Sequence, residues 1–491
     1  MQGIAYWIEK RAVIHPESIA IITDKKQITY RELNEQINKT ATFMRAELRL
    51  NAGERVAILS QNRYEYIVLL FAIAKLECIA VPLNIRLTIN ELSFQLQDSE
   101  TRVLFGEEQF KKEATLLKEN GSLQVIVDID SVNHLENEHN FFEPINENAS
   151  YLICYTSGTT GKPKGAVLTQ ANMFWNAINN TTAINLTSND RTIVLLPLFH
   201  IGGIGLFAFP TLFMGGTIVI PGKFEPEKAL TMMEEHQVTI VMGVPAIHDA
   251  LLHSPSFELR KLTSVRWFYN GGAPCPHELI DAFFEKGFLF GQGFGMSETS
   301  PTVFMLLKED AMRKKGSIGK PALFCDFQLV DQEGKLVKQG DVGEIVISGP
   351  NVMKGYWNRP EVTKETIRNG WLYTGDLARV DEEGFVYIVG RKKDMIISGG
   401  ENIYPLEIEQ VFNKISGISE VAVIGRIDEK WGEVPIAFVV AEEGSFLTSE
   451  VIIEHCKHYL AKYKIPKEII FIQELPKNAT GKVQKNLLDL K

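Results

Sequence analysis

Cysteine is scarce in this sequence: its 491 residues contain five cysteines, and no two of them form a CxxC pair. Such scattered thiols do not support a disulfide framework or a zinc site, and we expect them to be reduced. Basic charge is also in deficit, since 51 lysines and arginines against 61 aspartates and glutamates leave a net charge of -10. Without a basic excess to replace phosphate counterions, no nucleic-acid partner is expected.

Membrane and export signals are weak. The first residues, MQGIAYWIEKRAVIHPE, hold no long apolar run and no small-residue cleavage site, so we expect a cytoplasmic location. Residues 192–222 carry no charged side chain and are long enough to cross a bilayer. Pro197, Pro210 and several glycines interrupt this segment, which favours a buried strand, turn and helix beside an apolar cavity.

Short apolar runs alternate with helical patterns through most of the chain. Residues 55–60 and 78–83 are typical of strands, and the helical pattern at 64–76 lies between them. This spacing predicts βαβ units and an α/β fold whose large N-terminal domain has several layers. Residues 106–150 are polar and acid-rich and are predicted to be a surface excursion.

The pattern changes after about residue 322, where short strands and Asp/Glu-Gly turns predict a β-rich subdomain. Beyond Arg391 two helices and two strands predict a compact α+β unit. Because the chain exceeds the length that one core usually supports, we predict two domains. The large domain is residues 1–391, with the β-rich subdomain at its end, and the small C-terminal α+β domain is residues 392–491.

The stretch YTSGTTGKPKG, residues 155–165, follows an apolar run and combines glycines, four Ser/Thr hydroxyls and two lysines. It is not a Walker loop, because GxxxxGK[ST] matches from neither Gly158 nor Gly161. Backbone N–H groups and hydroxyls of such a turn can still surround phosphate oxygens, with Lys162 and Lys164 supplying charge. A solvated turn between two strands is the alternative interpretation.

This stretch resembles the phosphate-binding signature of the adenylate-forming enzymes, a family that includes acyl-CoA synthetases, beetle luciferases and peptide-synthetase adenylation domains. Six further motifs follow in the family's order and extend the resemblance over nearly the whole chain. They are LPLFHIGG (196–203), NGGAP (270–274), GFGMSET (293–299), YTGD (373–376), GRKKDMIISGGENIYP (390–405) and PKNATGK (476–482).

The resemblance implies an enzyme that uses ATP and Mg²⁺ to convert a carboxylic acid into an acyl-adenylate, and then transfers the acyl group to coenzyme A. It also implies a magnesium ligand at Glu298 with Thr156, a catalytic lysine at Lys482, and His200 at the mouth of the acid pocket. Lys393 aligns with a hinge that lets the small C-terminal domain move. The residues implied for the phosphates are Thr156, Ser157, Gly158, Thr159, Thr160 and Lys164.

The remaining implied contacts are with the nucleoside and with the pantetheine chain of coenzyme A. Phe294 and Ser297 depart from the tyrosine and threonine that the family commonly has, but they keep a ring face and a hydroxyl. The residues implied for adenine are Gly271, Gly272, Ala273 and Phe294, and Gly295, Met296 and Ser297 are implied for nucleotide binding without a stated contact. Asp376 and Arg391 are implied for the ribose, and Gly399 and Gly400 for the pantetheine channel.

The charge-free segment 192–222 favours an apolar carboxylic acid, with a medium- or long-chain fatty acid as the leading prediction. Two alternatives stay open: an o-succinylbenzoate–CoA ligase of menaquinone synthesis, and a free-standing adenylation enzyme that loads a carrier protein. The basic cluster Arg313-Lys314-Lys315 would allow peripheral membrane contact, although a solvated helix face is favoured. The sequence does not indicate an oligomeric state.

Overall fold

The computed structural model of the chain describes residues 3–121, 123–139, 145–156, 163–442, 444–477 and 483–488. The chain forms two compact units. The first comprises residues 1–326 and 347–372, and the second comprises residues 327–346 and 373–491. The domain boundary predicted between residues 391 and 392 falls inside the second unit and stays a prediction.

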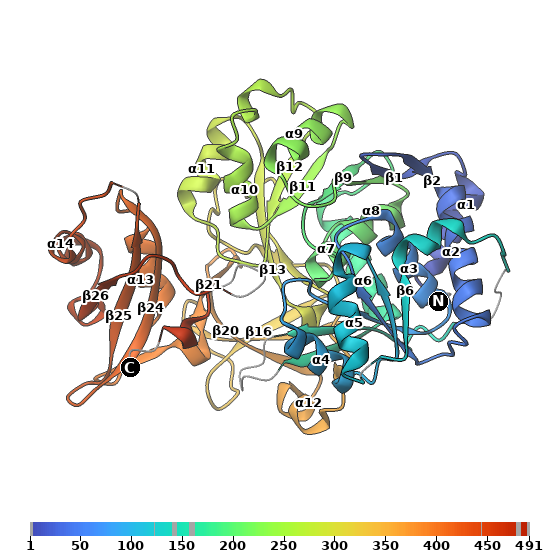
Figure 1. Ribbon diagram of the computed structural model, residues 1–491. Coiled ribbons are helices and arrows are strands. Elements are labelled where there is room, and N and C mark those ends of the chain that lie inside the picture. The colour runs from blue at the N-terminus through green and yellow to red at the C-terminus, as the bar shows by residue number, and fades with distance from the viewer. Residues whose placement is uncertain are drawn as a thin grey trace. The chain divides into compact units, whose positions relative to one another are not determined.

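The first unit contains a nine-stranded sheet with the strand order β15-β14-β13-β12-β11-β9-β10-β1-β2 (Figure 1). Parallel pairing joins β1 (Ile19–Thr23), β9 (Arg191–Val194), β10 (Thr217–Ile220), β11 (Ile240–Gly243), β12 (Trp267–Asn270) and β13 (Phe290–Gly295). Antiparallel strands flank this parallel core, namely β2 (Gln27–Thr29), β14 (Thr302–Met305) and β15 (Lys320–Pro321). A parallel sheet between helices is the arrangement that the alternating pattern predicts.

A seven-stranded sheet completes the first unit, in the order β18-β8-β7-β4-β3-β5-β6. Its strands are β3 (Arg55–Leu59), β4 (Ile79–Pro82), β5 (Val103–Gly106), β6 (Val125–Asp128), β7 (Ser150–Thr156), β8 (Lys164–Thr169) and β18 (Gly355–Tyr356). The predicted strand–helix–strand unit is confirmed, with α3 (Tyr64–Lys75) between β3 and β4. The prediction that residues 106–150 form only a surface excursion is partly wrong. This stretch contains α5 (Lys111–Glu119) and the edge strand β6. The apolar run of β6 is short and lies between polar residues.

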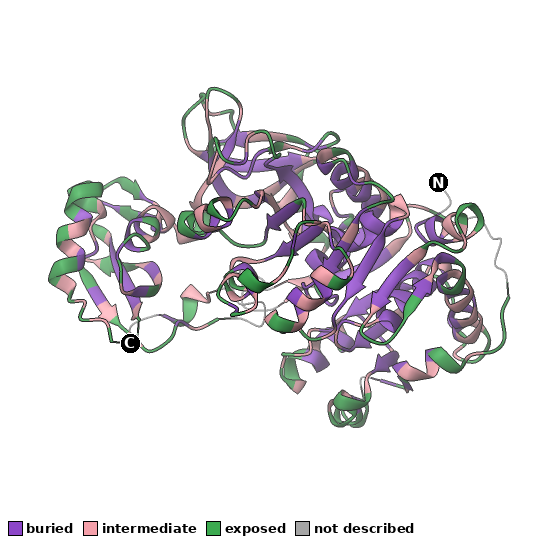
Figure 2. Cartoon of the chain, turned by 90° about the horizontal axis from the view of Figure 1, so that it is seen from above, coloured by how far each residue is buried: buried purple, intermediate pink, exposed green. Residues whose placement is uncertain are grey.

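Helices cover the sheets because each presents an apolar stripe. In α11 (His277–Glu285) the buried residues are Leu279, Ile280 and Phe283, which share one helical face. Figure 1 shows α9 (Pro226–Glu235), α10 (Pro245–Leu252) and α11 beside β11 and β12. Further helices of this unit are α1 (Ala5–Ile14), α2 (Tyr30–Ala46), α4 (Ile89–Asp98), α6 (Gln170–Ile184) and α12 (Pro360–Thr366). In Figure 2 the strands of this unit are mostly buried and the outer helix faces are exposed.

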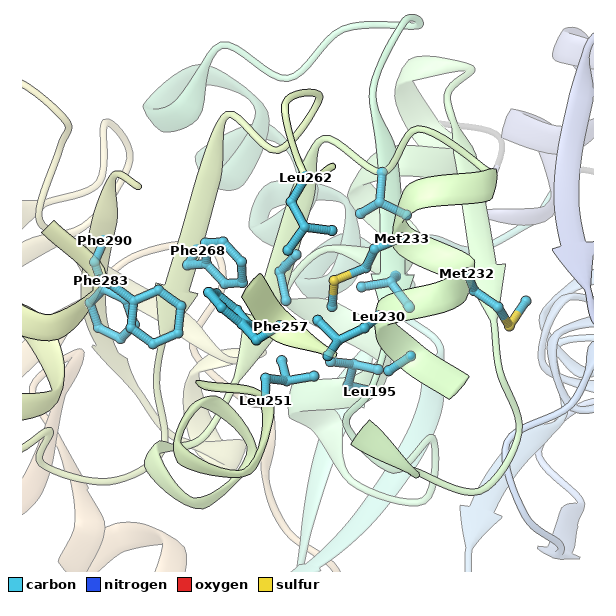
Figure 3. Close-up of a cluster of buried hydrophobic side chains, with 14 of the residues drawn as sticks. Leu195, Leu230, Met232, Met233, Leu251, Phe257, Leu262, Phe268, Phe283 and Phe290 are labelled. Atoms are coloured by element: carbon cyan, nitrogen blue, oxygen red, sulfur yellow. The ribbon is translucent and has the colours of Figure 1, made fainter. Parts of the chain in front are cut away.

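An aromatic core holds α9, α10 and α11 on the sheet (Figure 3). The ring centroids of Phe268 and Phe283 are 4.7 Å apart, and those of Phe283 and Phe290 are 5.0 Å apart. Leu230 and Met233 of α9 extend the same buried cluster. Strands β12 and β13 are thus anchored through Phe268 and Phe290, and their carboxyl ends follow these residues, at the edge where a parallel sheet commonly binds ligands.

The charge-free segment 192–222 folds as β9, α7 (Ile201–Gly205), α8 (Ala208–Met214) and β10. Phe209 stacks on Phe71 with ring centroids 4.7 Å apart, and Phe213 meets Trp7 edge-on at 5.0 Å. These two phenylalanines therefore pack into the core among the N-terminal helices. No helix among the described residues is both long and apolar enough to span a membrane.

The basic cluster at 313–315 forms ion pairs with neighbouring carboxylates. Lys315 Nζ lies 2.7 Å from Asp281 Oδ2, and Arg313 lies 2.5 Å from Asp310 Oδ1. Both pairs are at least partly exposed to solvent, as a solvated face would be.

The second unit has two sheets. The first contains β16 (Asp326–Val330), β17 (Gly343–Ser348), β20 (Trp371–Val380) and β21 (Val386–Arg391). The second contains β22 (Ile396–Ser398), β23 (Glu401–Ile403), β24 (Ile418–Asp428), β25 (Gly432–Ala441) and β26 (Glu468–Phe471), with helices α13 (Pro405–Phe412) and α14 (Ser449–Tyr459). A mixed α/β chain with a β-rich region and a C-terminal α+β region is thus confirmed.

Candidate active site

Glu298 lies on a tight turn, η4 (Ser297–Thr299), between the antiparallel strands β13 and β14. The backbone comes so close to itself here that a Cβ on Gly295 would lie 1.4 Å from the carbonyl oxygen of Pro301. Only glycine fits at that position. Glu298 is only 5% exposed, and a carboxylate buried to this extent needs polar or charged partners.

Asparagines from two distant segments hold this turn. Thr302 N donates to Asn176 Oδ1 at 3.0 Å, and Asn180 Nδ2 donates to Thr302 Oγ1 at 2.9 Å, both from helix α6. From a segment distant in sequence, Asn351 Nδ2 donates to the carbonyls of Thr299 at 2.9 Å and Thr302 at 2.8 Å. The chain just after Glu298 therefore has fixed hydrogen-bond partners at Thr299 and Thr302.

Tyr356 is a contact of the Glu298 side chain that the sequence analysis missed. Its hydroxyl donates to Glu298 Oε1 at 2.8 Å, and its ring lies 5.6 Å from the Nζ atom of Lys164. Strand β18 brings it there by pairing with β8, where Tyr356 is opposite Ala166. The structure thus links two predicted site residues, Lys164 and Glu298, through one aromatic ring. The tyrosine itself stands in the motif NVMKGYWNRP, but no local pattern reveals its partner.

Thr156 lies on the neighbouring strand β7, directly opposite Lys164 of β8. Its hydroxyl donates to the Lys164 carbonyl at 3.3 Å, and η4 is close to β8. The structure therefore brings the described ends of the phosphate-loop stretch beside the Glu298 turn. Its inner residues Ser157, Gly158, Thr159 and Thr160 lie outside the described residues.

Electrostatics around Glu298 keep its neighbours protonated. Burial, and then the nearby Glu298 carboxylate, raises the pKa of the Tyr356 phenol well above its usual range. The same two causes raise the pKa of the buried Cys154 thiol. Tyr356 is therefore a hydrogen-bond donor to the carboxylate at every ordinary pH.

The segment predicted for adenine follows β12, and the segment Phe294–Ser297 continues from the adjacent strand β13. Asn270 and Gln292 are directly opposite each other in this parallel pair, so both segments begin at the carboxyl ends of neighbouring strands. A Cβ atom added to Gly271 would lie only 2.8 Å from Met242 Cε. Gly272 has a φ of +83°, in the left-handed region that favours glycine. Ala273 accepts a hydrogen bond from Asn270 Nδ2 at 3.1 Å.

Two further observations concern this strand edge. Asn270 is 1% exposed, and its Oδ1 atom has no hydrogen-bond partner within the described part of the chain. The ring of Phe294 is half-buried and lies 6.1 Å from the ring of Phe304. An aromatic face and a buried acceptor beside side-chain-free backbone suit a planar ring that carries hydrogen-bond donors, such as adenine. Met296 is also half-buried, while Ser297 is buried.

In the second unit Asp376 and Arg391 are opposite each other on β20 and β21. Arg391 Nε lies 2.9 Å from Asp376 Oδ1, and Asp376 is buried. Glu344, which the sequence analysis did not identify, accepts from Gly375 N at 3.1 Å and from Lys392 Nζ at 2.8 Å. The two residues implied for the ribose are therefore an ion pair on adjacent antiparallel strands, with a second charged pair, Lys392 and Glu344, beside them.

The other predicted residues are placed as follows. Gly399 and Gly400 are exposed, and their φ values of +60 and +87 are in the left-handed region that favours glycine. His200 begins α7, where its Nδ1 accepts from Gly202 N at 3.1 Å. The His200 side chain is solvent-exposed, but the protein atoms around it lower its pKa by desolvation, so the imidazole is neutral at pH 7. Lys482 lies outside the described residues.

The donors around Glu298 fit a magnesium ion that also bridges phosphates. Mg²⁺ prefers hard oxygen ligands and commonly takes one or two carboxylates together with phosphate oxygens and water. The buried Glu298 carboxylate supplies such an oxygen, and Lys164 supplies a cation close by. In the described ranges, no three His, Cys, Asp or Glu side chains cluster as an all-protein metal site would require.

Comparison with known proteins gives consistent matches along the chain. The family model described as AMP-binding enzyme matches residues 8–357, and that of the AMP-binding enzyme C-terminal domain matches residues 407–482. A feruloyl-CoA synthase of Amycolatopsis sp is 39% identical over 485 residues, which cover 99% of this chain and 98% of the relative. A long-chain-fatty-acid–CoA ligase of Mycobacterium tuberculosis is 36% identical over 497 residues, with coverage of 99% and 98%. A solved o-succinylbenzoate coenzyme A synthetase from Bacillus subtilis, in complex with ATP and magnesium ion, has a TM-score of 0.90 and 36% identity, covering 98% of each chain.

Proposed function

The chain belongs to the AMP-binding enzyme family, and from that premise we propose that it is an ATP-dependent ligase that joins a carboxylic acid to coenzyme A. The acid's carboxylate oxygen attacks the α-phosphorus of ATP, which forms an acyl-adenylate and releases pyrophosphate. The thiol of coenzyme A then attacks the acyl carbon and expels AMP. The observation that carries this proposal is the buried Glu298 carboxylate beside Tyr356 and Lys164, in a chain whose relatives are named as CoA ligases.

Charge neutralisation is the first task of the site. Bound Mg²⁺ would offset phosphate charge between ATP and the protein. We assign its protein ligands as Glu298, with Thr156 beside it. Lys164 and the residues Ser157, Gly158, Thr159 and Thr160 would surround the phosphate oxygens with a cation, hydroxyls and backbone N–H groups.

Nucleoside binding is the second task. Gly271, Gly272 and Ala273 present backbone without bulky side chains, and Phe294 presents a ring face, so these residues suit adenine. Gly295, Met296 and Ser297 continue this segment toward Glu298. In the second unit, Asp376 would accept hydrogen bonds from the ribose hydroxyls, with Arg391 holding the carboxylate in place through its 2.9 Å contact.

Lys482, Gly399, Gly400 and His200 complete the proposed machinery. Lys482 would bring the carboxylate and the α-phosphate together and offset the charge that develops in the transition state. Gly399 and Gly400 leave room for the thin pantetheine chain, since neither carries a side chain. The neutral His200 imidazole would orient the acid, because its Nδ1 is fixed by the Gly202 N–H.

The substrate we propose is an acid with one carboxylate on an apolar body, with medium- and long-chain fatty acids preferred. The feruloyl and long-chain fatty acyl groups in the names of two relatives each come from an acid with a single carboxylate. A second carboxylate would need a cationic partner, and residues 192–222 contain no lysine or arginine. Activation of o-succinylbenzoate is the second candidate, favoured by the solved synthetase at 36% identity. Transfer to a carrier protein in place of coenzyme A is the third.

The test is a survey of acids with purified protein, ATP, Mg²⁺ and coenzyme A. Pyrophosphate release is measured for saturated acids of graded length, ferulate and o-succinylbenzoate, and each product is weighed by mass spectrometry. We expect an acyl-CoA product and the fastest release with a fatty acid. A Glu298→Gln variant is the matched control, since it keeps the side-chain size and removes the charge. If no acid gives pyrophosphate, or if adenylates form without any thioester, the proposed ligase activity is wrong.

A further inference from the structure

We propose that Tyr356 is a positioning residue that orients the Glu298 carboxylate for magnesium. This inference rests on the proposed function, in which Glu298 holds the metal. The Tyr356 hydroxyl donates to Glu298 Oε1 at 2.8 Å. One of the two carboxylate oxygens is therefore held, which restrains rotation of the carboxylate.

The segment that carries Tyr356 also holds the backbone of Glu298. Met353 N donates to the Glu298 carbonyl at 2.8 Å, three residues before the tyrosine. Lys354 N and Trp357 N donate to the carbonyls of Val167 and Gly165 at 2.9 Å and 2.8 Å, which anchors the segment on β8. One segment thus controls both the backbone and the side chain of the metal-binding residue.

Tyr356 is itself restrained. Its backbone N donates to Thr363 Oγ1 at 2.9 Å, and Thr363 Oγ1 donates to the Arg359 carbonyl at 2.9 Å. The Lys164 ammonium lies 5.6 Å from the centroid of the Tyr356 ring, within the range of a cation–π contact. The ring is consequently shared by a phosphate-binding cation and a metal-binding carboxylate. A donor that is held on several sides can hold its acceptor in turn.

The charge state of the pair suits this role. A phenol is uncharged at physiological pH and still donates a hydrogen bond. A neutral donor orients the carboxylate without cancelling the negative charge that attracts the cation. A lysine or arginine at the same place would compete with Mg²⁺ for that charge.

The test measures how strongly magnesium and ATP promote each other's binding. Calorimetry gives the Kd of ATP in EDTA and in saturating Mg²⁺, and their ratio is the metal coupling. We expect Tyr356→Phe to lower this ratio about tenfold, in line with the loss that follows removal of a partner behind a metal ligand. The Kd in EDTA should stay unchanged, which also shows that the variant is folded.

Two further variants separate the possible outcomes. Tyr30→Phe removes a buried hydroxyl that donates to the carbonyls of Gly216 and Leu212, so it should leave the coupling at the wild-type value. Glu298→Gln should reduce the coupling to near one, and adding Tyr356→Phe to it should change nothing further. If Glu298→Gln lowers the coupling and Tyr356→Phe does not, the positioning role is wrong and the metal site stands. If Glu298→Gln has no effect, the proposed metal site is wrong, and the inference that rests on it falls too.

Discussion

Replacing Asn351 by alanine should destabilise the first unit more than most single substitutions would. Asn351 is fully buried, and its Nδ2 donates to the carbonyls of Thr299 and Thr302 at 2.9 Å and 2.8 Å. Its Oδ1 accepts a weaker bond from Cys325 Sγ at 3.3 Å. Alanine removes every one of these bonds at once and supplies no replacement partner.

The expected loss follows from the two amide bonds. A buried hydrogen bond contributes about 1 kcal/mol net, and a carbonyl left buried without its donor costs about 1–3 kcal/mol. Two carbonyls are affected, so we expect a total of about 3 kcal/mol. At about 2 cal/mol/K of unfolding entropy per residue, a unit of roughly 350 residues would lose about 4 °C in its Tm.

Thermal unfolding followed by circular dichroism, with Asn351→Ala compared against wild type, measures this loss. Cys325→Ala is the matched control, because it removes only the weaker sulfur contacts of the same network, with Asn351 Oδ1, the Thr302 carbonyl and Asn179 Nδ2, and it should therefore cost less than Asn351→Ala. An Asn351→Ala variant as stable as wild type would show that the two carbonyls find other partners. Asn351 would then not be the residue that fixes the Glu298 turn.

Two other predictions concern a buried histidine and the C-terminal lysine. Burial lowers the pKa of His248 from 6.5 to about 4, so the unfolded chain binds a proton below pH 6.5 that the folded chain excludes, and stability falls as the pH drops. The loss between pH 7 and pH 5 should be about 2 kcal/mol, and His248→Gln should show a smaller drop in Tm over that interval; an identical drop would refute the assignment. Lys482→Ala should abolish pyrophosphate release and leave transfer of a preformed acyl-adenylate to coenzyme A largely intact, whereas equal loss of both half-reactions would contradict its role.

Local patterns in the sequence predicted much of the framework. The βαβ unit from β3 to β4 was recognisable because its apolar runs and helical period repeat over neighbouring residues. Strand β6 was not, because Val125–Val127 is too short a run to stand out inside an acid-rich stretch. Its place in the sheet comes from pairing with β5, a long-range contact that residue order does not encode.

The candidate site was likewise predictable from the sequence only in part. Motif order singled out Glu298, Asp376 and Arg391 as site residues, and these roles stay predictions; the ion pair between Arg391 and Asp376 was not predicted and comes from the structure. Tyr356 and Glu344 were missed, because their roles come from partners distant in sequence. A usable signal did exist in helix α6: asparagines weaken a helix interior, yet they recur here at the spacing of one helical face, and all of them are buried. They are Asn172, Asn176, Asn179 and Asn180.

These asparagines help to explain how Glu298, a residue on a turn, can be held in place for the metal binding that we propose. A turn lacks the regular hydrogen bonds of a helix or strand, so its precision must come from side chains or backbone of other elements. Helix α6 holds the turn at Thr302, and the segment 351–356 holds it at Thr299, at Thr302 and at both the backbone and the carboxylate of Glu298. Substitutions in that segment should therefore weaken metal binding without touching the metal, and the effect should grow with the number of bonds to the turn that each one removes.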